Sequence, residues 1–419
     1  MTGPRPRPDP GAVRARWAMT AVYFTVGLLL SAWFTQIPQL KSGLRLSDGQ
    51  LGFALLCPAI GALVSMQLSG RLARRFGSRP VVRVGCAVVA ATMPLIGDAG
   101  GLVSLVIALL VFGLADGLLD IGMNSHAVAV ERAMKRVVLQ SLHAAFSVGT
   151  ICGALSGAAA IALKVTPLGY LSGVAVVAEA VCLVATAHLL PASVDAGRTD
   201  EAGHVRGPAP WTTLVVVLGF AGAGCMMAEG MAESWDAVFL RNQRHALAAL
   251  ATIGYLLFTL AQFAGRLAGD RLHSRWGSVS LVRRGAILAA AGLLLQLTGP
   301  GPYWSMAGIA VYSLGLSVLV PVVFGAVGHG SADEHGDATV AGAIARFTTL
   351  SYLGYLLGPA SIGWLAEGVG LTWAMASVFL ILAGVIAASP WTSTALLGGA
   401  GAPSAEQWTE TIPVEESAR

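Results

Sequence analysis

Residues 70–85 read GRLARRFGSRPVVRVG, and residues 270–285 read DRLHSRWGSVSLVRRG. The two segments align without gaps at an offset of 200 residues and agree at eight of sixteen positions. Each segment follows the second long apolar run of its half of the chain. Two loops made basic by membrane topology alone would share arginines, but not the matched glycines at 77 and 277. The pattern predicts two halves of common ancestry.

The amino-acid composition of the chain is that of a membrane protein. Apolar residues make up 55% of the chain and charged residues 11%, whereas an ordinary soluble domain carries roughly a quarter charged residues. Mean hydropathy is +0.71, and apolar runs near the length of about 20 residues that a membrane-spanning helix needs recur along the chain. The first, 17–40, is too long for a signal-peptide core and lacks a cleavage site, so we expect it to be retained.

We therefore expect an all-α membrane protein, and not a soluble enzyme, with twelve transmembrane helices in two six-helix bundles. The first six spans are predicted at 17–40, 48–69, 80–97, 102–129, 138–163 and 168–190. The second six are predicted at 211–240, 247–268, 281–298, 303–327, 338–364 and 371–391. The predicted domains are a disordered tail 1–16, a bundle 17–190, a polar Pro- and Gly-rich linker 191–210, a bundle 211–391 and a disordered tail 392–419.

Basic residues predict the orientation, because arginine and lysine favour cytoplasmic loops. With the N-terminus inside, inner loops hold eighteen arginines and lysines and outer loops hold five. Both termini, the linker and both tails are therefore expected in the cytoplasm. The same loops account for the net charge of +4, so no nucleic-acid partner is expected. Arginine far outnumbers lysine, which favours a GC-rich bacterial genome and hence a bacterial inner membrane.

The loop after the second span resembles a motif of the major facilitator superfamily, in which glycine, a basic pair and a second glycine link helices two and three. The resemblance covers nearly the whole chain and implies the major facilitator fold, with these residues acting in conformational change. The acidic residue expected in the motif is replaced by Arg74 and Ser274. The matching loop residues are Gly70, Arg71, Arg75, Gly77 and Arg79, with Asp270, Arg271, Arg275 and Gly277 in the second copy.

Three further runs, 116–124, 142–149 and 354–359, resemble the branch that contains the fucose:proton symporters and their uncharacterised relatives. A second echo of the repeat, at an offset of 205, matches the fifth and eleventh spans. We expect the glycines of these spans, with the proline that follows, to serve helix packing: Gly149, Gly153, Gly354, Gly358 and Pro359. The glycine–proline motif of drug:proton antiporters is incomplete, because Ala154 stands where proline is expected.

The fourth span carries the clearest candidate site. Asp116, Asp120 and Asn124 lie at i, i+4 and i+8, hence on one helical face. Ionisable side chains inside a membrane are costly, so each is a hypothesis for a functional site. Asp116 is the first choice for taking and releasing a proton, and Asp120 for a proton relay or a cation partner. The alternative for Asp120 is a structural role beside the cytoplasmic loops.

The seventh span supplies a second acidic pair, Glu229 and Glu233, followed by Trp235. The branch resemblance implies a role for an acidic residue of this span followed by tryptophan, which favours Glu229 with Trp235. For Glu233 and Asp236, an exposed helix end facing the outer water is at least as good an interpretation.

Four other residues complete the candidate set. Arg346 would bind an anionic group or a carboxylate, or else extend to the inner interface. His143 would join a proton path, or else pack as a hydrogen-bonded core residue. Trp33 and Gln36 would stack on and hydrogen-bond a sugar-like ligand, although tryptophan near a helix end is more often an interface anchor.

These features favour a secondary transporter that moves a small solute with protons across the bilayer, expected as a monomer. Efflux of a drug or secondary metabolite is the alternative. The acidic pair of the fourth span would also suit an intramembrane hydrolase, but no second-helix partner, GxSxG or HExxH motif occurs. A passive channel or a signalling receptor would share the same fold. No catalytic residue, metal site or cofactor is predicted.

Overall fold

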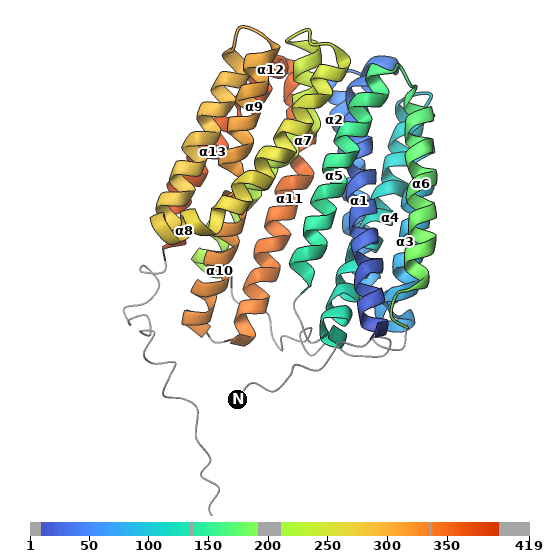
Figure 1. Cartoon of the computed structure of the whole chain (residues 1–419). Helices are drawn as coiled ribbons and strands as arrows, with labels where there is room; N and C mark the ends of the chain where they lie inside the picture. Colours follow the sequence, from blue (N-terminus) through green and yellow to red (C-terminus); the bar gives the residue numbers. More distant parts are fainter. Residues whose placement is uncertain (1–9, 135–137, 192–210, 336, 394–419) are drawn as a thin grey trace, which may run out of the picture.

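A computed structural model describes residues 10–134, 138–191, 211–335 and 337–393, which contain helices and no strands (Figure 1). Side chains 66–71, 73, 74, 140, 270, 328–342, 344 and 345 are outside the described set. Within those limits eleven helical stretches are long and apolar enough to cross a membrane. The helix α11, Asp337–Val369, is the remaining span. The predicted twelve-helix membrane fold is confirmed.

The first half contributes six helices that follow the predicted spans. Its first helix begins at Pro10 and not at Trp17, because proline is favoured in the first turn, where its missing N–H costs nothing. The predicted tails and linker otherwise lie outside the described residues. The helices are α1 Pro10–Gly43, α2 Asp48–Phe76, α3 Ser78–Gly97, α4 Leu102–Met134, α5 Leu139–Ala162 and α6 Pro167–Ala187.

The second half forms six spans from more segments, because two of them are interrupted. The tenth span is divided between α9 and α10 and the twelfth between α12 and α13, whereas α8 joins two spans across a sharp turn. The elements are α7 Thr213–Asn242, α8 Ala248–Thr298, α9 Pro302–Leu316, α10 Leu319–His335, α11, α12 Leu371–Ala376, α13 Val378–Ala388 and the 3₁₀ helix η2 Ser389–Thr392.

The repeated loop has the same geometry in both halves. Gly77 has φ 81° and Gly277 has φ 72°, a region that side chains with a Cβ rarely adopt. Six residues later, an arginine in each half reaches the end of the last span of that half. Arg83 donates to the Thr186 carbonyl at 3.0 Å, and Arg283 donates to the Ser389 hydroxyl at 2.8 Å. The repeat is therefore structural as well as sequential.

The predicted packing glycines bring two helix pairs into backbone contact. A Cβ on Gly149 of α5 would lie 2.0 Å from the Phe24 carbonyl oxygen of α1, and one on Gly354 of α11 would lie 2.0 Å from the Ala223 carbonyl oxygen of α7. One turn further, Gly153 and Gly358 repeat the arrangement against Leu28 and Met227. Both halves use the same contact.

We expect Gly149→Ala to destabilise the fold by about 1–3 kcal/mol, because the added methyl group forces α5 away from α1. The measurement is the apparent unfolding midpoint of purified protein in detergent. Gly173→Ala is the control, since a Cβ there meets nothing within 4 Å. Equal midpoints for the two variants would contradict the close contact.

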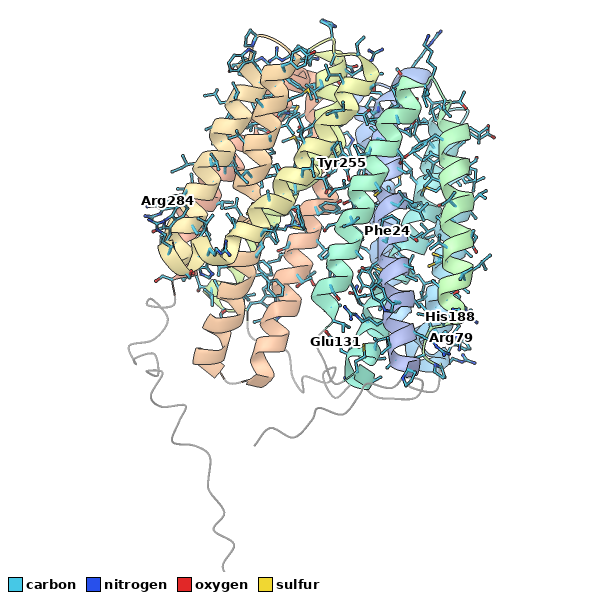
Figure 2. The ribbon with its side chains drawn as sticks, in the orientation of Figure 1. Phe24, Arg79, Glu131, His188, Tyr255 and Arg284 are labelled. Atoms are coloured by element: carbon cyan, nitrogen blue, oxygen red, sulfur yellow. The ribbon has the colours of Figure 1, made fainter. Side chains whose placement is uncertain are left out.

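The two halves meet at the end of the bundle where α1 ends and α2 begins. Glu367 of α11 accepts hydrogen bonds there from the Gly49 N–H at 3.0 Å and from the Ser47 hydroxyl. A Cβ on Gly363 would lie 2.6 Å from Gly52 Cα. Deeper in the bundle lies Tyr255 of α8, which is labelled in Figure 2. Its ring stacks with that of Phe34 of α1 at 5.8 Å between ring centroids. The bundle is joined across its halves at this end.

We expect Gly363→Trp to separate the halves here, because no space exists for the indole. Hydrogen–deuterium exchange should rise in residues 48–52 and 360–367, where backbone amides lose protection. Gly368→Trp, on the same helix end, should leave exchange in 48–52 unchanged because a Cβ at Gly368 meets nothing within 4 Å. Unchanged protection in Gly363→Trp would show that the two halves do not depend on this contact.

Candidate functional site

A cavity of about 290 Å³ lies between the two halves. The first half lines it with α1, α2, α4 and α5, and the second half with α7 and α11. Its polar groups include Asp116 and Asp120 from α4 and Tyr352 and Tyr355 from α11. The rest of the lining is mainly apolar and aromatic. The cavity joins carboxylates to rings in one space.

The three polar residues of α4 divide their roles. Asp116 and Asp120 line the cavity, whereas Asn124 holds Asp120 from below: its Nδ2 donates to Asp120 Oδ1 at 3.0 Å. Tyr23 of α1 in turn donates its hydroxyl to Asn124 Oδ1 at 2.8 Å. Neither aspartate forms a salt bridge with a described residue. Asp120 is oriented by hydrogen bonds, and Asp116 faces the cavity without a cation.

A second cavity of about 220 Å³ adjoins the first, because Leu30 and Phe146 line both. It is lined by His143 of α5 from the first half and by Glu233, Gln262 and Arg266 of α7 and α8 from the second. Tyr355 links the two spaces: it lines the first cavity and donates its hydroxyl to Glu233 Oε2, which faces the second, at 2.7 Å. The halves therefore form two adjoining chambers.

Glu229 lies behind the second chamber. Its side chain is buried, and Oε1 accepts a hydrogen bond from Gln262 Nε2 at 2.9 Å. The Arg266 guanidinium is 3.8 Å from the same oxygen, but the arginine side chain is half exposed, so solvent weakens the attraction. Glu229 contacts the chamber through these two partners.

The end of α7 differs from one interpretation of the sequence. Asp236 is fully buried and accepts a hydrogen bond from Gln296 Nε2 of α8 at 2.7 Å, and Glu233 lines a chamber. The view that these acids face outer water is wrong, because Gln296 of α8 packs against Asp236 and Tyr355 of α11 packs against Glu233. Trp235, also buried, donates its indole N–H to the Pro359 carbonyl at 2.9 Å and joins α7 to α11.

The other candidates separate into those that reach the cavities and those that do not. Trp33 lines the first cavity. Gln36 does not line either cavity; it is buried and donates to the Thr35 hydroxyl at 3.2 Å. Arg346 also lies away from both, with its guanidinium 4.6 Å from the centre of the Trp211 ring. Among the described residues Arg346 forms no ion pair with the α4 acids.

The described residues of the two repeated loops, 70–79 and 270–277, do not line either cavity. They lie at the end of the bundle opposite to Glu367. Arg79 donates to the Ala187 carbonyl at the end of α6 at 2.9 Å, and the Arg75 guanidinium stacks on Phe76 at 5.2 Å. Arg271 and Arg275 are exposed. The side chains of Arg71 and Asp270, and the surroundings of Gly70, lie outside the described residues.

Sequence reasoning missed Gln262, Arg266, Tyr352 and Tyr355. Gln262 and Arg266 stand four residues apart in an otherwise apolar run of α8, which is the same signal that selected the acidic residues of α4 and α7. Tyrosine in a membrane helix carries little information by itself. Only the packing of α11 against α7 shows that Tyr355 faces an acid.

We expect Gln296→Leu to lower the free energy of unfolding by about 1–3 kcal/mol, because the buried Asp236 carboxylate loses its donor. The double variant Asp236→Leu/Gln296→Leu should recover most of that loss, since no buried polar group is then left unpaired. Chemical unfolding in detergent measures both values. Additive losses in the double variant would contradict a direct contact between the two side chains.

Comparison with known proteins agrees with the membrane-helix fold described above. A family model described as Major Facilitator Superfamily matches residues 19–342. The chain belongs to the major facilitator superfamily. An uncharacterized MFS-type transporter of Yersinia pestis is 33% identical over 367 residues, covering 88% of this chain and 93% of the relative. The resemblance found in the loop motif is confirmed.

Solved structures share the major facilitator fold at low sequence identity. A variant of the nucleoside transporter NupG superposes with a TM-score of 0.73 at 14% identity, covering 90% of this chain and 98% of NupG. The E. coli fucose:proton symporter FucP superposes with a TM-score of 0.59 at 14% identity, covering 92% of this chain and all of FucP. The chain is thus a multi-pass membrane transporter of a superfamily that carries small solutes.

Proposed function

We propose that the chain is a proton-coupled secondary transporter that moves a small solute by alternating access. The observation that supports this most is the pair of adjoining chambers between the halves, to which both halves contribute acidic or basic side chains. Two similar bundles can rock about a site held between them. A solute in the first chamber would touch α4 of one half and α11 of the other, so that its binding depends on how the halves are placed.

Asp116 is the proposed proton carrier. It lines the first chamber, and Asp120 lies one turn away on the same helix. Loss of water penalises the charged form of a carboxylate, and neither acid has a described basic partner to offset that penalty. Hydration of the chamber changes as access alternates, which would let Asp116 bind a proton on one side and release it on the other. His143 and Glu233 would extend the path into the second chamber.

In the orientation that we propose, both termini lie in the cytoplasm of a bacterial cell and the protein lies in its inner membrane. This rests on the excess of arginine and lysine in the loops on that side. The end at which Glu367 joins the halves is then the outer one. We infer that the structure is an inward-facing arrangement, sealed toward the outside by α2 with α11 and by α5 with α8.

The lining of the first chamber favours a small polar solute with an apolar or ring-shaped face. Trp33, Phe34, Phe112 and Phe146 supply rings, while the two aspartates and the tyrosine hydroxyls supply hydrogen bonds. FucP is a fucose:proton symporter and NupG is a nucleoside transporter, and both solutes are of this general kind. A sugar-like or nucleoside-like solute therefore fits best.

Efflux of a drug or secondary metabolite is the second candidate. Met123 and Met226 line the same chamber, and flexible thioethers accommodate varied apolar ligands. Overexpression in a toxin-sensitive strain should distinguish the two. Protection against several unrelated toxins favours efflux, and accumulation of a labelled sugar or nucleoside driven by a pH gradient favours uptake.

The test of proton coupling starts with a thermal-shift screen of sugars, nucleosides and amphipathic amines on purified protein, since a bound solute stabilises the fold. The strongest hit is then followed in proteoliposomes. We expect Asp116→Asn to abolish accumulation driven by a pH gradient but to retain exchange of labelled for unlabelled solute, because exchange needs no net proton movement.

The control for that measurement is Asp98→Asn, which changes an aspartate at the end of α3 that does not line either chamber. It should accumulate solute like the parent protein. Gradient-driven accumulation that survives Asp116→Asn would remove Asp116 from the coupling mechanism. Loss of exchange as well would assign Asp116 to solute binding and not to protons.

A further inference from the structure

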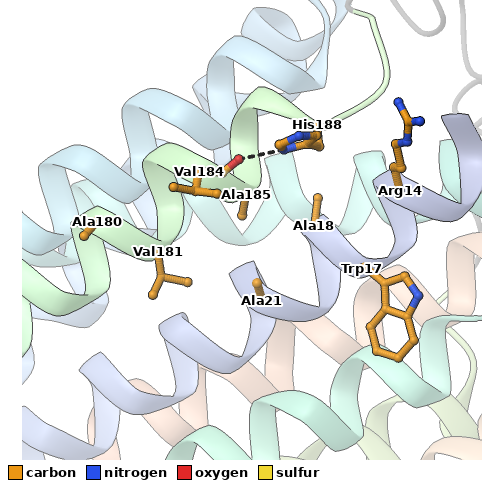
Figure 3. A pocket seen from close by; sticks show the side chains of 9 residues that line it. All are labelled: Arg14, Trp17, Ala18, Ala21, Ala180, Val181, Val184, Ala185 and His188. Carbon is orange, nitrogen blue, oxygen red and sulfur yellow. Dashed lines mark hydrogen bonds between the residues drawn. The ribbon is translucent and has the colours of Figure 1, made fainter.

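A groove of about 610 Å³ runs along the outside of the first half between α1 and α6 (Figure 3). It is separate from the two chambers and shares no lining residue with them. Small apolar side chains form its floor, with Ala18 and Ala21 from α1 facing Ala180 and Val184 from α6. A surface of this kind accepts an extended hydrocarbon chain.

One end of the groove carries basic and aromatic groups. Arg14 and Trp17 of α1 and His188 at the end of α6 line it, and Trp17 is 64% exposed (Figure 3). The Arg16 guanidinium lies 5.6 Å from the centre of the Trp17 ring but does not line the groove. We call Arg14, Trp17 and His188 the basic collar.

The hydrogen bonds of the collar leave polar atoms for a ligand. His188 Nδ1 is 2.9 Å from the Val184 carbonyl oxygen, which only accepts, so Nδ1 carries the proton. Nε2 is then an acceptor in the neutral ring, and it donates to a phosphate oxygen only in the imidazolium form, in which both ring nitrogens are donors. Next to it, Arg79 already donates to the Ala187 carbonyl at the end of α6. That arginine offsets the negative helix end that would otherwise repel an anion.

The groove lies near the N-terminal end of α1. The helix α1 has 34 residues, about 50 Å at 1.5 Å per residue, which exceeds the hydrocarbon core of about 30 Å. Its first turns, with Arg14, therefore project into the headgroup region, where tryptophan is enriched. The alanine and valine floor lies deeper, at the level of the acyl chains.

We propose that the groove binds a phospholipid with an anionic headgroup, its phosphate at the basic collar and one acyl chain along the alanine floor. Basic pockets between helices on the cytoplasmic side recognise such lipids. Placement in the cytoplasmic leaflet rests on the orientation proposed above, but the pairing of charge and groove does not. Glu179, the nearest acid along α6, lines a different cavity with Arg83 and Cys86, so it does not cancel the charge of the collar.

The test is native mass spectrometry of the full chain in detergent with equal amounts of dioleoyl phosphatidylglycerol and dioleoyl phosphatidylcholine. The parent protein should retain phosphatidylglycerol preferentially. Arg14→Gln should lower that preference about fivefold, as expected for loss of one cation near an anionic lipid, and Arg14→Gln/His188→Gln should lower it further. The control is Arg284→Gln in the second half, where the arginine also stacks on a tryptophan, Trp276, at 4.4 Å (Figure 2).

Filling the floor tests the acyl chain separately from the charge. Ala180→Trp should reduce retention of both lipids while the collar is intact, whereas Leu380→Trp, at a position 78% exposed in the second half, should not. Each variant must elute as the same single species as the parent. The proposal would be overturned if the Arg14→Gln/His188→Gln variant kept the parent's preference for phosphatidylglycerol. Displacement of the lipid by glycerol phosphate alone would also overturn it. None of these outcomes depends on solute transport.

Discussion

Backbone contact between α1 and α5, and between α7 and α11, is the constraint on which the rest of the structure depends. Gly149 and Gly354 allow a carbonyl oxygen of the partner helix to occupy the place of a side chain. In a bilayer, where no hydrophobic effect draws helices together, such close packing is a main source of association. All four helices line the first chamber, so the contact that holds each half together also positions Trp33, Phe146 and Tyr355 around the candidate site.

The two halves share a scaffold but not their chemistry. The Asp, Glu, Lys and Arg side chains that the first half contributes to the described chambers are both acidic, Asp116 and Asp120. The second half contributes acidic side chains, Glu229 and Glu233, and the basic side chain of Arg266. Hydrogen bonds through Asn124, Gln262 and Tyr355 orient most of these groups. Among the described acids of the chambers, Asp116 faces its chamber without such a partner, which is the basis for proposing it as the proton carrier.

Much of the fold can be predicted from the sequence because the thickness of the bilayer dictates the length of each hydrophobic span. The repeat adds a second, independent indication, because it shows that the spans of one half correspond to those of the other. The limits of prediction are equally physical. Asp236 was interpreted partly as an exposed residue because the sequence predicts the span but not that Gln296 of α8 packs against this turn of it. Arg266 was overlooked because it lies near the end of a span, where arginine is common. Gln36 faces Thr35 and not the cavity, and no periodicity resolves a rotation of that size.

The glycine turns at 77 and 277 also bear on how far the two loops can differ. A backbone with φ near 80° excludes nearly every residue with a side chain, so a mutation at either turn would disrupt the link between two spans. Half of the sixteen aligned positions around these turns differ between the two halves, yet both copies are glycine. The two loops can therefore differ in half of their side chains and still make the same turn, provided that this one position stays glycine.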